Sequence, residues 1–347
     1  MGVFDDVLKD SESLFKNEFA LDFEFIPKEL PHRENQQKYV AECIAPLFNN
    51  RNGRNLFICG APGIGKTVAV RHVFKELEEK TSDVIPIYVN CWKKDTSYKI
   101  LVSICEQIGY KWTHNKRTDE LLDVVSKILN KKTTAICLDE VDKVKEIDIL
   151  YSLSEDLLKK SIIVIANDKG WISNLDQRIR SRFMPEHLEF PEYSAVETRD
   201  IIRERIKFAF FDGIWDAEAM NSIIDRAAEM KDVRAGLFLL KEAGNSAESK
   251  ASRQILCEHS DIAISKLEGF KIKNSSDFGE DERVILELVK NHSGKTVKEL
   301  YDVGGLELSY RHFHRKIDEL KKNSMIFFGD KRDGSTIVNY GKKLTDY

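Results

Sequence analysis

The fold of this chain is decided by one stretch of eight residues, Gly60-Ala61-Pro62-Gly63-Ile64-Gly65-Lys66-Thr67. The stretch matches the pattern G-x-x-x-x-G-K-[ST], whose backbone N–H groups surround phosphate oxygens. Its glycines permit the positive φ angles that turn successive N–H groups toward one point. The lysine of the pattern reaches the β- and γ-phosphates, and the threonine hydroxyl coordinates Mg²⁺. The stretch therefore predicts a phosphate-binding loop that uses Lys66 and Thr67.

The flanking residues have the structure that such a loop requires. The apolar run Leu56–Cys59 predicts a buried strand that ends at the loop, and apolar residues at helical spacing after Thr67 predict a helix. The positive end of that helix dipole would face the phosphates. A glycine-rich turn could match by chance, but strand, loop and helix together favour binding of a nucleoside triphosphate. We expect the nucleotide to contact nine consecutive residues, Gly60, Ala61, Pro62, Gly63, Ile64, Gly65, Lys66, Thr67 and Val68.

Composition narrows the class of protein. A length of 347 residues suggests two or three domains. The formal net charge is −4, so a nucleic-acid partner would need a local basic patch. The six cysteines include no C-x-x-C pair, which favours reduced thiols in an intracellular protein. No apolar run approaches the roughly 20 residues that span a bilayer, and the N-terminus is acidic. We expect no membrane partner and a cytoplasmic, nucleoid-associated protein of a prokaryotic-type cell.

The order of apolar segments predicts an α/β domain followed by a helical one. Short apolar runs alternate with helical patterns, which is typical of a parallel sheet. We expect its five strands at Leu56–Cys59, Ile85–Val89, Thr134–Leu138, Ile162–Ala166 and Leu188–Phe190. From Ser194 to about Phe270 the pattern is helical throughout.

The last part of the chain predicts a winged helix. Residues 271–276 have the polar composition of a linker. Helical patterns follow near 278–291, 296–302 and 309–323, and then two β segments, Met325–Phe328 and Thr336–Tyr340. Three helices and a hairpin make this variant of the helix-turn-helix. We therefore expect three domains, residues 1–193, 194–272 and 273–347.

Two strand ends carry the side chains that hydrolysis requires. The strand at 134–138 ends in Asp139 and Glu140. Asp139 suits Mg²⁺ coordination together with Thr67, and Glu140 would polarise the attacking water. Asn167 follows the strand at 162–166, where an amide could orient that water. Each is also an ordinary turn residue, but the phosphate loop upstream favours the catalytic interpretation.

A basic cluster follows, with arginines at 178, 180 and 182. Such a cluster is usually a solvated face. The alternative is an arginine that stabilises transition-state charge on a nucleotide held by a neighbouring subunit.

The ordered set of these motifs resembles an AAA+ ATPase and, more narrowly, the archaeal replication initiators related to eukaryotic origin-recognition and cell-division-control proteins. The set comprises the phosphate loop, Asp139–Asp142, Asn167, the arginine cluster and Asp232-Val233-Arg234. The resemblance covers about residues 20–345. It implies an AAA+ parallel five-stranded sheet, a helical lid and a C-terminal winged helix. The chain departs from the family at Lys231, where a glycine is usual, and in the segment 111–117.

The resemblance also implies roles for single residues. Asn167 would be sensor 1, Arg234 would be sensor 2 on the lid, and Arg182 would be the arginine finger, with Arg178 as a second candidate. His32 and Arg33 lie in a segment similar to the one beside the adenine in that family. The cofactors implied are ATP or ADP with Mg²⁺.

Positive charge is concentrated at the expected DNA-binding end. Residues 309–343 hold nine Lys and Arg against four Asp and Glu, a net charge of +5. Arg311 and Arg315 lie one helical turn apart in the expected recognition helix, which suits phosphates or a guanine edge. Lys331 and Arg332 at the wing suit phosphates or the minor groove. Winged helices also serve as protein-binding modules, so both partners stay open at this point.

The resemblance implies an ATP-dependent replication initiator that binds duplex origin DNA. It also implies recruitment or loading of the replicative minichromosome-maintenance helicase, and other initiator subunits are possible partners. ATP hydrolysis would act as a switch between domain arrangements, and the residues leave open whether the rate is useful. Two alternatives stay open: a clamp-loader-like AAA+ motor that acts on proteins, and a DNA-binding regulator with a nearly inert ATP site.

Overall fold

The computed structural model describes residues 13–23, 25–276, 280–305, 308–322, 326–332 and 335–340. The chain divides into two compact units, residues 1–264 and 265–347. Each unit has its own buried apolar core.

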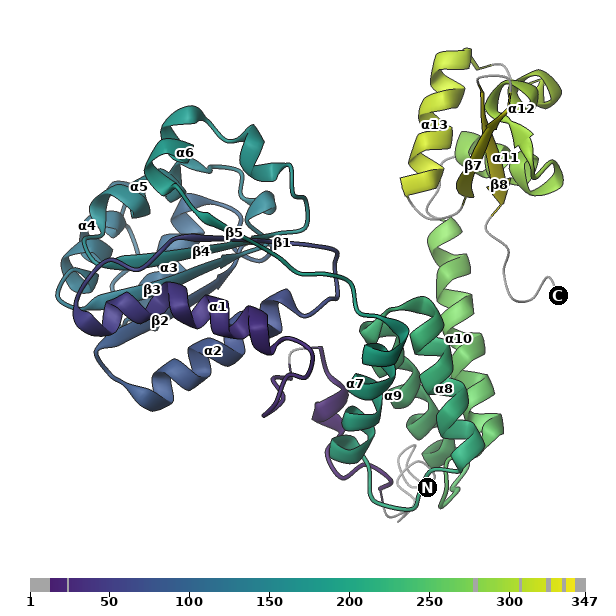
Figure 1. The fold of residues 1–347 in the computed structure, drawn as a ribbon, viewed down its shortest axis with the longest axis horizontal. Coiled ribbons are helices and arrows are strands. Elements are labelled where there is room, and N and C mark those ends of the chain that lie inside the picture. Colours follow the sequence, from purple (N-terminus) through teal and green to yellow (C-terminus); the bar gives the residue numbers. More distant parts are fainter. Residues whose placement is uncertain are drawn as a thin grey trace. The chain divides into compact units, whose positions relative to one another are not determined.

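The first unit contains a parallel five-stranded sheet in the order β2-β3-β4-β1-β5 (Figure 1). Its strands are β1 (Leu56–Cys59), β2 (Val84–Asn90), β3 (Thr133–Asp139), β4 (Lys160–Ala166) and β5 (Glu186–Glu189). They confirm the five predicted strands, with ends displaced by no more than two residues. Four of them read as near-continuous apolar runs because helices cover both faces of the sheet.

The side chains of each strand alternate between two apolar cores. Leu56 and Ile58 of β1 pack into the core on one face, and Phe57 packs into the core on the other. The first core is covered by α1 (Glu34–Ile44) and α2 (Lys66–Lys80). Four helices cover the second: α3 (Ser97–Gln107), α4 (Thr118–Leu129), α5 (Asp148–Asp156) and α6 (Gln177–Phe183). Three short 3₁₀-helices of the described residues connect these elements: η2 (Ala45–Asn49), η3 (Val141–Lys143) and η4 (Trp171–Asn174). Another, η1 (Glu18–Leu21), precedes α1.

A bundle of helices, which we call the lid, follows the sheet (Figure 1). It comprises α7 (Ala195–Ala209), α8 (Ala217–Met230), α9 (Val233–Ser249) and the beginning of α10 (Cys257–Ser276). Ser194 starts α7 through a capping box, since its hydroxyl accepts from the Glu197 N–H and the Glu197 carboxylate accepts from the Ser194 N–H. The predicted linker at 271–276 is wrong: these residues continue α10, because none of them is a proline or glycine that would end a helix. The two units divide at residues 264 and 265, within this helix.

Residues 13–23 and 25, which we call the N-terminal strap, pack on the lid. The ring of Phe15 lies 4.9 Å from that of Phe210. The carboxylate of Glu248 accepts hydrogen bonds from the backbone N–H of Leu14 and the hydroxyl of Ser13, both at 2.8 Å. Ala20 and Leu21 of η1 are buried. The N-terminal strap is therefore part of the lid surface, although it precedes the sheet in sequence.

The second unit is a winged helix, as predicted. Its elements are α11 (Glu280–Asn291), β6 (Lys295–Thr296), α12 (Val297–Gly304), α13 (Tyr310–Lys322), β7 (Ile326–Arg332) and β8 (Ser335–Tyr340). The strands form an antiparallel sheet in the order β6-β8-β7. Phe313 and Ile317 of α13 are buried against Ile285 and Leu300. The two-residue strand β6 escaped prediction because it is too short to show alternation.

In the part of the chain that the structure describes, no helix combines the length and the apolar character that a membrane span needs. All six cysteines are free, and five of them are buried.

The departure at Lys231 has a structural consequence in the lid. Lys231 ends α8 in the left-handed region, with φ +51° and ψ +33°. Glycine adopts this conformation without the Cβ penalty that other L-residues incur. The turn between α8 and α9 therefore has a backbone conformation that favours glycine, and Lys231 adopts it with strain.

We predict that Lys231→Gly stabilises the protein by about 0.5–1 kcal/mol, because the left-handed turn loses its Cβ strain. The measurement is urea unfolding of the full chain. Lys127→Gly is the matched control: this exposed lysine lies within α4, where glycine costs about 1 kcal/mol. Equal destabilisation by both substitutions would contradict the assignment of strain to Lys231.

Candidate nucleotide-binding site

The polar side chains of the site meet because three parallel strands end side by side. β4 lies between β1 and β3 in the sheet. The loop at residues 60–67, which we call the phosphate loop, follows β1, while Asp139 ends β3 and Asn167 follows β4. The carboxyl ends of parallel strands share one edge, which is where open α/β sheets bind their ligands.

Backbone geometry makes two glycines of the phosphate loop indispensable. Gly60 has φ +147°, and a Cβ added there would lie 2.6 Å from the carbonyl oxygen of Phe190. Gly65 has φ +91° and precedes the first residue of α2. A Cβ on Gly65 would lie 2.8 Å from the Tyr193 hydroxyl. Helix α2 begins at Lys66, so its first backbone N–H groups face the loop, as expected for an anion site.

The Lys66 ammonium is buried and is bound only by neutral oxygen atoms among the described residues. Its Nζ donates to the carbonyl oxygens of Gly60 and Ala61, at 2.7 and 2.8 Å, and to Oδ1 of Asn167, at 2.9 Å. Burial is the main cause that lowers the pKa of this ammonium. A buried cation without a carboxylate partner fits an anionic ligand such as a phosphate. The structure thus brings the predicted Lys66 and Asn167 into direct contact.

Asp139 is the centre of a second buried network. Its Oδ2 accepts from the Thr67 hydroxyl at 2.7 Å and from the Tyr88 hydroxyl at 2.6 Å, and its Oδ1 accepts from the Glu140 N–H at 2.9 Å. The structure therefore joins the two predicted metal ligands, Thr67 and Asp139. Carboxylate and hydroxyl oxygens suit Mg²⁺, so this pair fits the ion.

Tyr88 was missed by the sequence analysis. It lies in β2 opposite Cys137, two residues before Asp139 in β3. Paired residues and residues two apart share a face of the sheet, so Tyr88 points toward the carboxylate. Only the strand pairing could have revealed this contact.

Glu140 has an unusual backbone and an unusual acidity. Its φ of +53° places it in the left-handed region, a strain that is common at functional sites. Burial, followed by the charges of Asp139 and Asp142, raises the pKa of the Glu140 carboxyl. A carboxylate with a raised pKa is a better proton acceptor, which suits activation of a water molecule.

The lid completes the pocket through Arg234. Asp232 caps α9 by accepting from the backbone N–H of Arg234, at 2.9 Å. This places Arg234 in the first turn of α9, where a Cβ on Gly63 would lie 3.6 Å from its Cδ and Nε. Lys66, Glu140, Asn167 and Arg234 all line one pocket. The remaining lining residues include a mainly apolar group: Phe23, Leu30, Tyr193, Ile201, Arg205 and Leu237.

His32 and Arg33, predicted beside the base, do not line this pocket. The Arg33 guanidinium is 1% exposed and donates to the carbonyl oxygens of Ile64, His32 and Pro191 at 2.7–3.1 Å. It also stacks on the Tyr193 ring, 3.7 Å from the centroid. The His32 ring lies beside the carboxylates of Glu197 and Asp200. In this structure Arg33 braces the back of the phosphate loop, a role that its position in sequence does not indicate.

The other predicted residues lie outside the pocket. Arg182 forms an ion pair with Glu155 and is half-exposed, and Arg178 pairs with Asp176. Arg311 and Arg315 are exposed on α13. Lys331 and Arg332 are the last residues of β7 and pair with Thr336 and Ser335 of β8.

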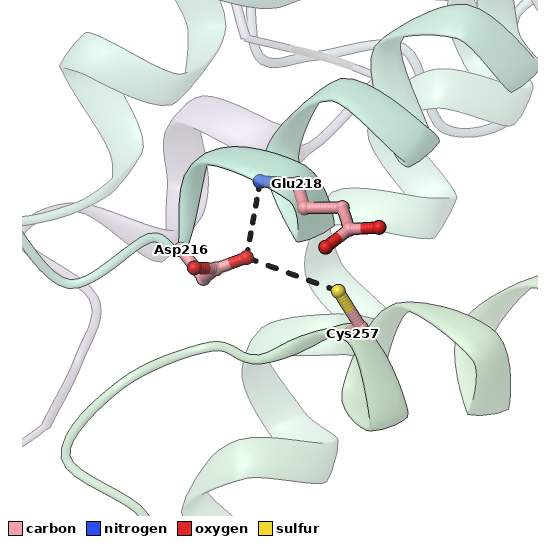
Figure 2. Close-up of side chains that lie close together, drawn as sticks. All are labelled: Asp216, Glu218 and Cys257. Carbon is pink, nitrogen blue, oxygen red and sulfur yellow. Dashed lines mark hydrogen bonds between the residues drawn. The ribbon is translucent and has the colours of Figure 1, made fainter.

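One further cluster of ligand-type side chains is explained by helix capping. Figure 2 shows Asp216, Glu218 and Cys257, whose ligand atoms lie within 4.8 Å of one another. Oδ1 of Asp216 accepts from the backbone N–H of Glu218 and Ala219, at 3.0 and 3.1 Å. The Cys257 thiol approaches the same oxygen, at 3.8 Å. Capping of α8 accounts for the position of Asp216, and the cluster offers no separate evidence of a metal.

Comparisons with known proteins agree with this arrangement. Residues 50–168 match the family described as AAA domain, and residues 199–265 match the Cdc6 AAA+ ATPase-type lid domain. The ORC1-type DNA replication protein 1 of Sulfurisphaera tokodaii is 32% identical over 323 residues, which cover 87% of this chain and 81% of that protein. The chain belongs to the ORC1-type DNA replication protein family. An ORC1-type DNA replication protein 2 of Archaeoglobus fulgidus is 28% identical over 352 residues, 97% of this chain and 93% of that protein.

Solved structures share the fold of this ORC1-type chain. The Aeropyrum pernix ORC1 protein in complex with DNA is 26% identical, with a TM-score of 0.68 and coverage of 95% of this chain and 94% of that one. The ORC2 protein of the same organism, solved as ADPNP-ADP complexes, has a TM-score of 0.76 at 19% identity, with 94% of each chain covered. The match to the AAA domain implies that the chain binds a nucleotide. The matches to the AAA domain, the lid domain and the ORC1 structure confirm the predicted fold class.

We predict that Arg33→Lys destabilises this ORC1-type protein by about 2–4 kcal/mol. Arg33 donates to its three carbonyl oxygens from three separate nitrogens, whereas a lysine has all its donors on one nitrogen and leaves buried acceptors unpaired. Thermal unfolding measures the effect. Arg51→Lys is the control, since Arg51 is exposed and such changes stay within about 0.5 kcal/mol. Equal melting temperatures for the two variants would refute the bracing role of Arg33.

Proposed function

We propose that the chain is an ATP-dependent initiator of DNA replication that binds duplex origin DNA and helps to recruit or load the replicative minichromosome-maintenance helicase. The observation that carries the proposal is the joint pocket of the phosphate loop and the lid. Lys66 comes from the start of α2 and Arg234 from α9 of the lid, and both line this pocket. The buried Lys66 and the exposed Arg234 come from separate elements and fit one polyanion, so nucleotide state would set the position of the lid.

The residues of the pocket divide the work of hydrolysis. The phosphate loop and Lys66 would bind the phosphates, and Asn167, already bonded to Lys66, would orient the water that Glu140 activates. Thr67 and Asp139 would hold Mg²⁺, whose positive charge neutralises the phosphates when it is bound. Tyr88 and the Glu140 N–H keep the Asp139 carboxylate in place. Arg234 would stabilise charge that develops on the terminal phosphate.

Arg182 is proposed as the arginine finger toward a nucleotide held by a second initiator subunit. The placement of Arg182 on α6, outside its own pocket, and its half-exposed ion pair with Glu155 support this assignment. Surface ion pairs of this kind contribute little stability, so Arg182 can exchange partners at low cost.

We predict that Glu140→Gln lowers ATP hydrolysis by about 10²–10⁴-fold and retains ATP affinity, because the amide cannot accept the proton from water. Lys66→Ala should instead lose ATP binding. The measurements are phosphate release and equilibrium binding of ATP, with the exposed Glu79→Gln as control. If Glu140→Gln hydrolyses ATP at the wild-type rate, Glu140 is not the catalytic base. If the wild-type protein itself does not hydrolyse ATP, the DNA-binding regulator with a nearly inert ATP site is favoured.

The winged helix supplies the proposed DNA contact. The exposed Arg311 and Arg315 lie four residues apart and therefore on one face of α13, while Phe313 and Ile317 are buried on its other face. A relative of 26% identity was solved in complex with DNA. Lys331 and Arg332, at the end of β7, are proposed as wing contacts. Together these residues would bind phosphates and base edges of a duplex.

We predict that the double variant Arg311→Gln/Arg315→Gln weakens duplex binding at least tenfold and lowers the slope of log K against log salt by about 2, one for each lost phosphate contact. Anisotropy titrations on duplexes taken from beside replication starts measure both values. Lys38→Gln/Lys75→Gln removes the same charge from exposed positions of α1 and α2 and should leave the slope unchanged. An unchanged slope in the α13 variant would exclude this face and favour a winged helix that docks proteins.

A further inference from the structure

Arg205 is a buried cation of the lid that the proposed hydrolysis does not use. It is 8% exposed and lies in α7, one helical turn after Ile201. Its Nη1 donates to the carbonyl oxygen of Ala20 at 3.0 Å, and its guanidinium lies 5.0 Å from the centre of the Phe25 ring. No carboxylate of the described residues forms an ion pair with it.

The charge of Arg205 persists at neutral pH. Burial lowers the pKa of this guanidinium to about 10, which still leaves it protonated. A guanidinium has five N–H donors, and one of them is bound to Ala20. Keeping a buried cation with so few partners is costly unless a ligand completes its hydrogen bonds.

Arg205 lines the nucleotide pocket among apolar side chains. The phosphate side of the pocket already has its own cations, Lys66 and Arg234. Leu30, Ile201 and Leu237 line the pocket with Arg205. When the phosphates of a nucleotide lie on the phosphate loop, we expect its base to lie among these apolar side chains. A purine ring is largely apolar, and small-molecule pockets are lined mainly by apolar side chains.

We propose that Arg205 recognises the purine base: its guanidinium donates a hydrogen bond to one acceptor nitrogen of the adenine ring. This inference rests on the proposed function, since it assigns the base end of the same ATP site. The ring nitrogens N1, N3 and N7 of adenine are acceptors, which a guanidinium matches. Leu30 and Ile201 would pack on the ring.

The same side chain joins the base to the N-terminal strap. Arg205 holds Ala20 of the strap, and Phe23 of the strap lines the pocket. The strap is also bound to the lid through Glu248. Arg205, on the lid, would therefore contact both the base and the strap. In this role it acts as a specificity-determining residue.

The test uses ATP analogues in which one ring nitrogen is replaced by C–H. The full chain is titrated with ATP, with 1-deaza-, 3-deaza- and 7-deaza-ATP, and with inorganic tripolyphosphate, which has no base. We expect the wild-type protein to bind one deaza analogue about 10- to 100-fold more weakly than ATP, as loss of a bond to a charged donor implies. Arg205→Met should bind ATP and that analogue equally. Its affinity for tripolyphosphate should match that of the wild type.

A control separates recognition from support of the strap. Glu248→Gln weakens the attachment of the strap at Leu14. It should change the affinities for ATP and for the analogue by the same factor. If Arg205→Met does not fold, Arg205→Lys keeps the positive charge and should still show reduced discrimination.

Three results would overturn the proposal. One is a wild-type protein that binds all three analogues as tightly as ATP. Another is Arg205→Met with undiminished discrimination, and the third is an equal loss of affinity for tripolyphosphate and ATP. In each case ATP still binds, so the proposed function survives; a wild-type protein that binds no ATP would refute both.

Discussion

The buried ammonium of Lys66 is the constraint on which the nucleotide site depends. A buried ammonium group needs a hydrogen-bond acceptor for each of its three N–H donors. It finds them in the carbonyl oxygens of Gly60 and Ala61 and in the amide of Asn167. These acceptors come from the ends of β1 and β4, so the neighbouring strands must pair in one register. The hydrogen bonds of Lys66 therefore require both the conformation of the loop and the register of the two strands.

Asp139 couples the next strand to the same centre. Its carboxylate accepts from Thr67 of α2, from Tyr88 of β2 and from the Glu140 backbone. A buried carboxylate with three donors is held in position and stays ready to bind a cation. Glu140, the next residue, has a φ of +53°, so a strained backbone follows the buried carboxylate directly. The sheet thus supplies a rigid half of the site.

The lid supplies the adjustable half through a few side chains. Arg234 approaches the phosphate loop from the first turn of α9, and Arg205 lines the pocket from α7. The N-terminal strap packs on the lid through Phe15 and Glu248, yet its Phe23 lines the pocket. A ligand that contacts both halves can shift the equilibrium between lid positions only by its differential affinity for them. Under the proposed function, such a shift would pass the nucleotide state to DNA replication, the process that names the ORC1-type family.

The sequence by itself determined the phosphate loop, the five strands, the carboxylates at the end of β3 and the winged helix. Each of these depends on local pattern: a glycine spacing, an apolar run, a charge at a strand end. Tertiary structure alone decided the contacts between segments distant in the chain. Tyr88 reaches Asp139 only because β2 pairs with β3, and Arg33 braces the loop from 31 residues away in sequence. The packing of the strap on the lid and the burial of Arg205 were also decided by tertiary structure. Burial and hydrogen-bond partners depend on which segments pack against each other, and no local sequence pattern encodes that packing.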